Sequence, residues 1–93
     1  MTTRKDRIED TLTRTFAPQR LVVIDESHQH AGHQGMDGTA GTHIRVRIVA
    51  ETFAGMTRIA RHRAVTDALK SEIDDGLHAL AIEPAAPGEP TRW

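Results

Sequence analysis

The stretch His43-Ile44-Arg45-Val46-Arg47-Ile48-Val49 decides the fold class of this 93-residue chain. Its even-numbered positions hold Ile, Val and Ile, and two of the odd-numbered positions beside them hold arginine. Alternation with a period of two is typical of a β-strand that buries one face and exposes the other. The stretch therefore predicts a sheet that is covered on one side only.

The sequence before this strand predicts a helix and a second strand. Ile8, Leu12 and Phe16 recur every four residues, which places them on one face of a helix. The helix is expected to end at Ala17-Pro18, because the residue before a proline disfavours helical geometry. Residues 21–24, Leu-Val-Val-Ile, form a short apolar run that predicts a strand.

A long loop rich in glycine and histidine joins the two predicted strands. Glycines occur at every third position from residue 32 to residue 41, and His28, His30 and His33 lie among or just before them. So long a loop in so small a domain is more often functional than not. Histidines on a glycine-rich loop are compatible with metal binding, so His30 and His33 are candidate ligands and His28 a further donor.

Two helices and a third strand follow. Phe53-Ala54-Gly55 predicts a turn, and Thr57 is placed to cap a short helix over residues 58–61. A longer helix is expected to run to about residue 75, and residues 77–82 predict the third strand. The order of helix, strand, strand, helix, helix, strand predicts an α+β fold, with the helices on one face of a three-stranded sheet.

His78 stands at the start of this third strand. It shares strand parity with Leu80 and Ile82, so its ring is expected to be half-buried, fixed in orientation and reachable at one nitrogen. These are the properties of a metal ligand. The alternative from spacing alone is a histidine at a strand edge with a purely structural role.

Composition indicates one domain of residues 1–83, followed by a flexible tail rich in proline and alanine over residues 84–93. No apolar run approaches the roughly 20 residues of a membrane span, and the first residues lack the apolar region of a secretory signal. We therefore expect a cytoplasmic protein with no membrane contact.

The absence of cysteine from the chain excludes thiol catalysis and any cysteine-ligated metal site of its own. Charge is uneven, since residues 42–66 contain five arginines against one glutamate. Such a segment fits an anion-binding or nucleic-acid-binding surface. It fits equally well a solvated strand face followed by the start of a helix.

Five short stretches resemble, in order and spacing, those of the BolA family. They are Asp25-Glu26-Ser27-His28-Gln29-His30, Thr42-His43-Ile44-Arg45-Val46, Phe53-Ala54-Gly55, Arg61-His62-Arg63 and Gly76-Leu77-His78-Ala79-Leu80. The resemblance covers about residues 5–83 and implies a KH-like fold, α-β-β-α-α-β, with a helix-turn-helix at the second and third helices. The chain departs from the family at Ile44, where phenylalanine is usual, and in its longer glycine-rich loop.

The resemblance also implies a metal site and a partner. The family histidine that matches His78 is implicated as an iron ligand, and His30, followed by His33, best matches the second ligand from the loop. The iron belongs to a [2Fe–2S] cluster shared with a monothiol glutaredoxin, which supplies a cysteine thiolate while glutathione supplies another sulfur. The chain alone, a monomer or weak dimer, would hold no cofactor. The implied role is iron–sulfur cluster trafficking or iron homeostasis.

The alternative function is that of a DNA-binding regulator. Family members are regarded as transcriptional regulators of morphology and stress responses, and Arg58, Arg61 and Arg63 are placed to contact phosphate from the helix-turn-helix region. The acidic residues of the second of these helices count against it, because phosphate contacts supply most of the affinity for DNA.

The remaining polar residues predict no catalytic centre. Ser27, His30 and Asp25 are the residue types of a triad, but they are crowded on one loop with no oxyanion hole. His43 is expected to be structural or exposed, and His62 to pack or cap at a helix junction. The sequence therefore predicts an interaction protein that is not an enzyme.

Overall fold

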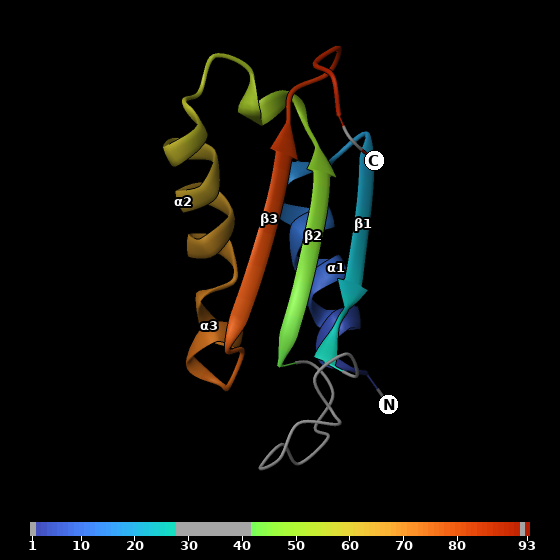
Figure 1. The fold of residues 1–93 in the computed structure, drawn as a ribbon, viewed down its shortest axis with the longest axis vertical. Coiled ribbons are helices and arrows are strands. Elements are labelled where there is room, and N and C mark those ends of the chain that lie inside the picture. The colour runs from blue at the N-terminus through green and yellow to red at the C-terminus, as the bar shows by residue number, and fades with distance from the viewer. Residues whose placement is uncertain (1, 28–41, 92) are drawn as a thin grey trace.

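The computed structural model describes residues 2–27, 42–91 and 93 of the chain. Within them the elements are α1 (Arg4–Phe16), β1 (Arg20–Asp25), β2 (His43–Val49), the 3-10 helix η2 (Glu51–Phe53), α2 (Arg58–Ala68), α3 (Lys70–Asp74) and β3 (Ala79–Ala85). The predicted α+β fold with three helices and a three-stranded sheet is confirmed (Figure 1). Among the described residues no helix is long and apolar enough to cross a membrane.

The sheet has the order β1-β2-β3, with β2 in the centre. β1 pairs with β2 in antiparallel fashion, and β3 runs parallel to β2 with His43 opposite Ala79. The alternation that predicted β2 is confirmed, because Ile44, Val46 and Ile48 are each at most 1% exposed while the residues between them are partly exposed. α1 passes behind the sheet in Figure 1, and α2 lies beside β3.

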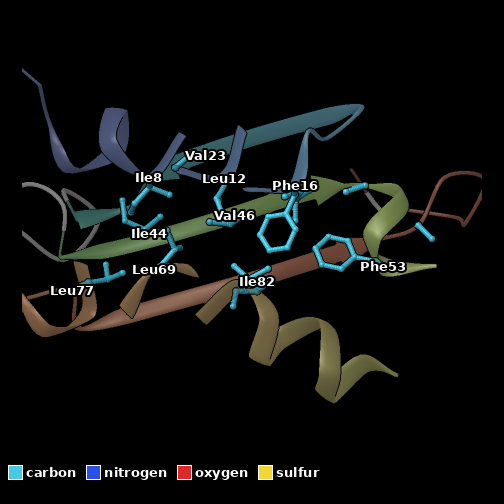
Figure 2. Packing of buried hydrophobic residues seen from close by; sticks show 14 residues of the cluster. Ile8, Leu12, Phe16, Val23, Ile44, Val46, Phe53, Leu69, Leu77 and Ile82 are labelled. Atoms are coloured by element: carbon cyan, nitrogen blue, oxygen red, sulfur yellow. The ribbon is translucent and has the colours of Figure 1, made fainter. Parts of the chain in front are cut away.

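The core lies between the buried face of the sheet and the helices. α1 contributes Ile8, Leu12 and Phe16, the three residues of the predicted apolar face (Figure 2). The Phe16 ring lies 5.2 Å, centroid to centroid, from the ring of Phe53. α1 also ends where predicted, at Ala17, whose φ of 45° puts it in the left-handed region that terminates helices.

The two helices after β2 differ from the prediction. The first is the long one, capped by the Thr57 side chain, which accepts a hydrogen bond from the backbone N–H of Ala60. Only Leu69 separates it from the short α3, and Leu69 continues the helical hydrogen bonding on both sides. A helix-turn-helix needs a turn of about three or four residues between its helices. The junction of α2 and α3 therefore lacks the turn expected there.

β3 begins and ends later than predicted, and residues beyond 83 are packed. The strand includes Pro84 and Ala85, and Ala86 is only 5% exposed. Further along, Glu89 forms an ion pair with Arg61. The structure thus differs from the flexible tail expected from residue 84, because this segment completes the sheet and packs against α2.

Candidate functional site

The starts of β2 and β3 lie side by side, because parallel strands begin at the same edge of a sheet. The backbone N–H groups of His78 and Ala79 both donate to the carbonyl oxygen of Thr42, at 2.9 and 3.1 Å. Thr42 is the first described residue after the segment 28–41. The fold therefore brings position 78 next to the end of that segment, although the two are far apart in sequence.

The described residue before this segment, Ser27, is fastened to the same place. Ser27, which is 5% exposed, accepts hydrogen bonds at Oγ from the backbone N–H groups of Thr42 and His43, at 2.9 and 3.1 Å. The Ser27 N–H in turn donates to Oδ1 of Asp25 at 2.9 Å. Both flanks of the segment thus meet beside His78. The predicted ligands His30 and His33, and the further donor His28, lie outside the described residues.

The side chain of His78 is exposed, which corrects the expectation of a half-buried ring. The cause is the later start of β3: His78 precedes the first strand residue, so the parity argument from Leu80 and Ile82 does not hold its ring against the core. Gly76 reverses the chain after α3 with a φ of 123°, a conformation that favours glycine. An exposed imidazole is accessible to a metal that a second protein presents.

The other two described histidines have different surroundings. His43 begins β2, is partly buried, and has Nδ1 3.1 Å from Oγ1 of Thr42, in keeping with a structural role. His62 is exposed on α2 and caps neither end of that helix, contrary to expectation. In the part of the chain that the structure describes, no three His, Cys, Asp or Glu residues are grouped to hold a metal ion. His78 therefore needs donors from elsewhere to form a complete site.

An ion-pair network fixes the segment that leads to His78. Glu72 on α3 is buried and accepts hydrogen bonds from Arg4 Nη1 and Arg7 Nε, both at 2.8 Å. Its backbone carbonyl accepts from Arg4 Nη1 at 3.1 Å and from the N–H of Leu77 at 3.1 Å. The start of α1 is thereby tied to the turn before His78, a link that the sequence analysis did not identify.

The hydrogen bond from Arg7 lowers the pKa of Glu72 below the ordinary value of 4.5, and the charges of both arginines add to this effect against the opposing influence of burial. A depressed pKa in the folded state stabilises the fold above the unfolded-state value. That stabilisation is lost as the pH falls through the folded-state value.

We expect Glu72→Gln to lower the free energy of unfolding by about 2 kcal/mol at neutral pH, because charge-assisted hydrogen bonds are lost. The difference from wild type should shrink as the pH falls below 4.5 and vanish below the lowered folded-state pKa of Glu72, where the carboxylate of the folded wild-type protein is also protonated. Urea unfolding curves over this range measure both quantities. Asp74→Asn, which removes an exposed ion pair with Lys70, is the control and should cost under about 0.5 kcal/mol. A difference that does not change with pH would contradict the assignment.

The sequence profile of the family described as BolA-like protein matches residues 12–89. The chain belongs to the BolA family. The resemblance inferred from the five short stretches is thereby confirmed.

Relatives and solved structures of the BolA family match almost the whole chain. A Sinorhizobium protein described as an uncharacterized protein in the cobS 5' region is 66% identical and covers 95% of this chain and 96% of its own. BolA1 from Arabidopsis thaliana has a solved structure with a TM-score of 0.84 and 37% identity, over 98% of this chain and 100% of that one. The Vibrio cholerae protein named DNA-binding transcriptional regulator BolA is 41% identical, over 84% of this chain and 70% of its own.

The three arginines predicted to contact phosphate in this BolA-family chain have different environments. Arg61 is engaged by Glu89 through two hydrogen bonds of 2.6 and 2.9 Å, and its Nε donates to the carbonyl of Met56. The hydrogen bond from Arg61 lowers the pKa of Glu89 to about 2. Arg61 therefore holds the C-terminal segment through Glu89.

Arg58 and Arg63 are exposed on α2, and neither forms an ion pair within residues 2–27, 42–91 and 93. Arg58 and His62 also line a cavity of about 650 Å³ between the start of α2 and the end of β3. This cavity lies at the end of β3 opposite His78, so the basic residues of α2 and the candidate ligand belong to separate regions of the protein.

Proposed function

We propose that this protein is a non-enzymatic interaction protein that binds a monothiol glutaredoxin and shares the ligation of a [2Fe–2S] cluster with it. Its role would be cluster trafficking or iron homeostasis in the cytoplasm. The observation that carries the proposal is the position of His78. Its imidazole is exposed, and its backbone N–H donates to the carbonyl of Thr42, the first described residue after the histidine-bearing segment 28–41.

The donor types of the chain fit such a shared cluster. Histidine nitrogen replaces cysteine on one iron of Rieske-type [2Fe–2S] centres and raises the reduction potential. Because the chain contains no cysteine, every thiolate must come from outside it. In the proposal the glutaredoxin cysteine and glutathione supply these sulfurs. His78 supplies one nitrogen, and His30, or else His33, supplies the other.

The direct test is to purify the protein together with a monothiol glutaredoxin under anaerobic conditions and to determine iron and acid-labile sulfide. The proposal requires one [2Fe–2S] cluster per pair of unlike chains, and no iron in this protein alone. A complex without iron, or a cluster that remains on glutaredoxin homodimers, would refute it. Visible circular dichroism then reports whether the ligand set differs from that of the glutaredoxin homodimer.

DNA binding is the second candidate function. It is favoured by the exposed Arg58 and Arg63 and by the name of the Vibrio cholerae relative. The paired Arg61 and the acidic residues of α3 weaken it, because affinity for DNA depends on cations free to contact phosphate.

This second candidate makes its own prediction. If α2 contacts DNA, the double variant Arg58→Glu, Arg63→Glu should weaken duplex binding and reduce the slope of log affinity against log salt by about 2, since two phosphate contacts are lost. Fluorescence anisotropy at several salt concentrations measures both. Arg14→Glu, which removes an exposed arginine of α1, is the control. Binding that is absent at low salt, or insensitive to salt, would eliminate the candidate.

A further inference from the structure

The Ser27 hydroxyl lies at the centre of the hydrogen bonds at this edge of the sheet. Its Oγ accepts from two successive backbone N–H groups, those of Thr42 and His43, and lies 3.3 Å from Oγ1 of Thr42. The side chain is almost fully buried at 5% exposure. A buried serine with this many partners is held in one position.

Ser27 continues the pairing of β1 with β2 beyond the point where the regular ladder stops. The last registered pair is Asp25 with Ile44, and the N–H of Glu26 then donates to the carbonyl of His43 at 2.7 Å. One residue further, the Ser27 side chain replaces a backbone carbonyl as the acceptor. Removing the hydroxyl takes this acceptor from both backbone N–H groups, and backbone donors in folded proteins are nearly always paired.

The same strand end holds His78. The carbonyl of Thr42, which shares one planar peptide with the N–H of His43, accepts from the N–H groups of His78 and Ala79 at 2.9 and 3.1 Å. A continuous series of hydrogen bonds thus runs from the Ser27 hydroxyl through the peptide between Thr42 and His43, whose N–H donates to Ser27 Oγ at 3.1 Å, to the backbone of His78. Asp25 completes it by accepting from the Ser27 N–H at 2.9 Å.

We propose that Ser27 is a positioning residue for His78. Its hydroxyl fixes the peptide between Thr42 and His43, and that peptide fixes where the exposed imidazole of His78 stands on the surface. The consequence for a cluster rests on the proposed function. Removal of the hydroxyl keeps the imidazole of His78 but loosens the peptide to which the His78 backbone is hydrogen-bonded. Groups hydrogen-bonded directly to a ligand typically change metal affinity by about 10- to 100-fold. Ser27 acts through one peptide more, so an effect at the lower end of this range is expected.

Ser27→Val and Ser27→Thr form the decisive pair, because the two side chains have similar shapes and differ in the hydroxyl. In the protein alone, Ser27→Val should speed amide hydrogen exchange of His78 and Ala79 about 10-fold and shift the His78 ring resonances, whereas Ser27→Thr should restore wild-type values. In a titration with cluster-loaded glutaredoxin, Ser27→Val should lower the apparent affinity for this partner about 10-fold. Thr66→Ala, which removes a hydroxyl bonded to the Arg63 carbonyl on α2, should change neither readout.

The outcomes separate this inference from the proposed function. If His78→Ala removes the cluster signature and Ser27→Val does not alter it, Ser27 has no positioning role, although the proposed function stands. If neither variant alters it, both fail. Should Ser27→Val not fold, exchange in the wild-type protein decides, because the N–H groups of Thr42, His43, His78 and Ala79 must open together as one unit. Independent opening of the two pairs would overturn the inference.

Discussion

Titrating His78→Ala into cluster-loaded glutaredoxin should leave the visible circular dichroism of the glutaredoxin unchanged, whereas the wild-type protein should convert it to that of a mixed complex. The proposed iron ligand is then missing, while the partly buried His43, with Nδ1 near Thr42, and His62 on α2 are unchanged. We expect the apparent affinity for the cluster-loaded partner to fall by about 100-fold or more, exceeding the usual effect of an outer-sphere residue.

This substitution should not affect folding, which makes the result easy to interpret. The ring of His78 is exposed, and exposed side chains away from special features contribute within about 0.5 kcal/mol. The hydrogen bond to Thr42 involves only the backbone of residue 78 and is retained in the variant. Thermal unfolding of the two proteins should therefore coincide.

His62→Ala is the matched control, because it also removes an exposed imidazole but from α2, beside the cavity at the opposite end of β3. It should behave as wild type in the titration. The combined variant His30→Ala, His33→Ala tests the second ligand, and the single variants then identify which of the two nitrogens is used. Spectra of His78→Ala that match those of wild type would rule out the ligand assignment.

The order of elements and the face of the sheet that is buried could be predicted because both are local properties. The alternation over residues 43–49 and the four-residue spacing of Ile8, Leu12 and Phe16 each lie within one element, and both are confirmed. The end of β3 could not be predicted in the same way. Pro84 suggested that the strand stops, but β3 is an edge strand, where proline is tolerated.

Other features of the site depend on contacts between residues distant in sequence. Ser27 and Thr42 are joined by a hydrogen bond, Glu72 is held by arginines of α1, and Arg61 binds Glu89. No spacing rule links such residues, because the fold alone brings them together. The exposure of His78 follows from a two-residue difference in the start of β3, which is within the usual uncertainty of element boundaries.

Phe53→Ala should be the most destabilising single substitution that we predict, at about 4 kcal/mol. Phe53 is fully buried at 0% exposure and packs on Phe16, so its removal loses the burial of a large ring and leaves a cavity between α1 and η2. Phe53-Ala54-Gly55 is one of the stretches that resemble the BolA family, and the structure gives two of its residues distinct roles. The phenylalanine fills the core, and Gly55 adopts a φ of 78° in the turn that follows.

A loss of this size matters because small domains have little stability to spare. Domains of this length unfold with about 5–15 kcal/mol, and each kcal/mol corresponds to about 4–8 °C in Tm. Phe53→Ala should therefore lower Tm by about 15–30 °C and the urea midpoint in proportion. Phe53→Leu, which refills most of the space, should recover more than half of the loss. Ile59→Ala, at a side chain 72% exposed, should change stability by under about 0.5 kcal/mol. A free energy of unfolding for Phe53→Ala within about 1 kcal/mol of wild type would be on the order of a typical surface change. The ring would then not be packed against Phe16 in solution, and the position of η2 over the core would be wrong.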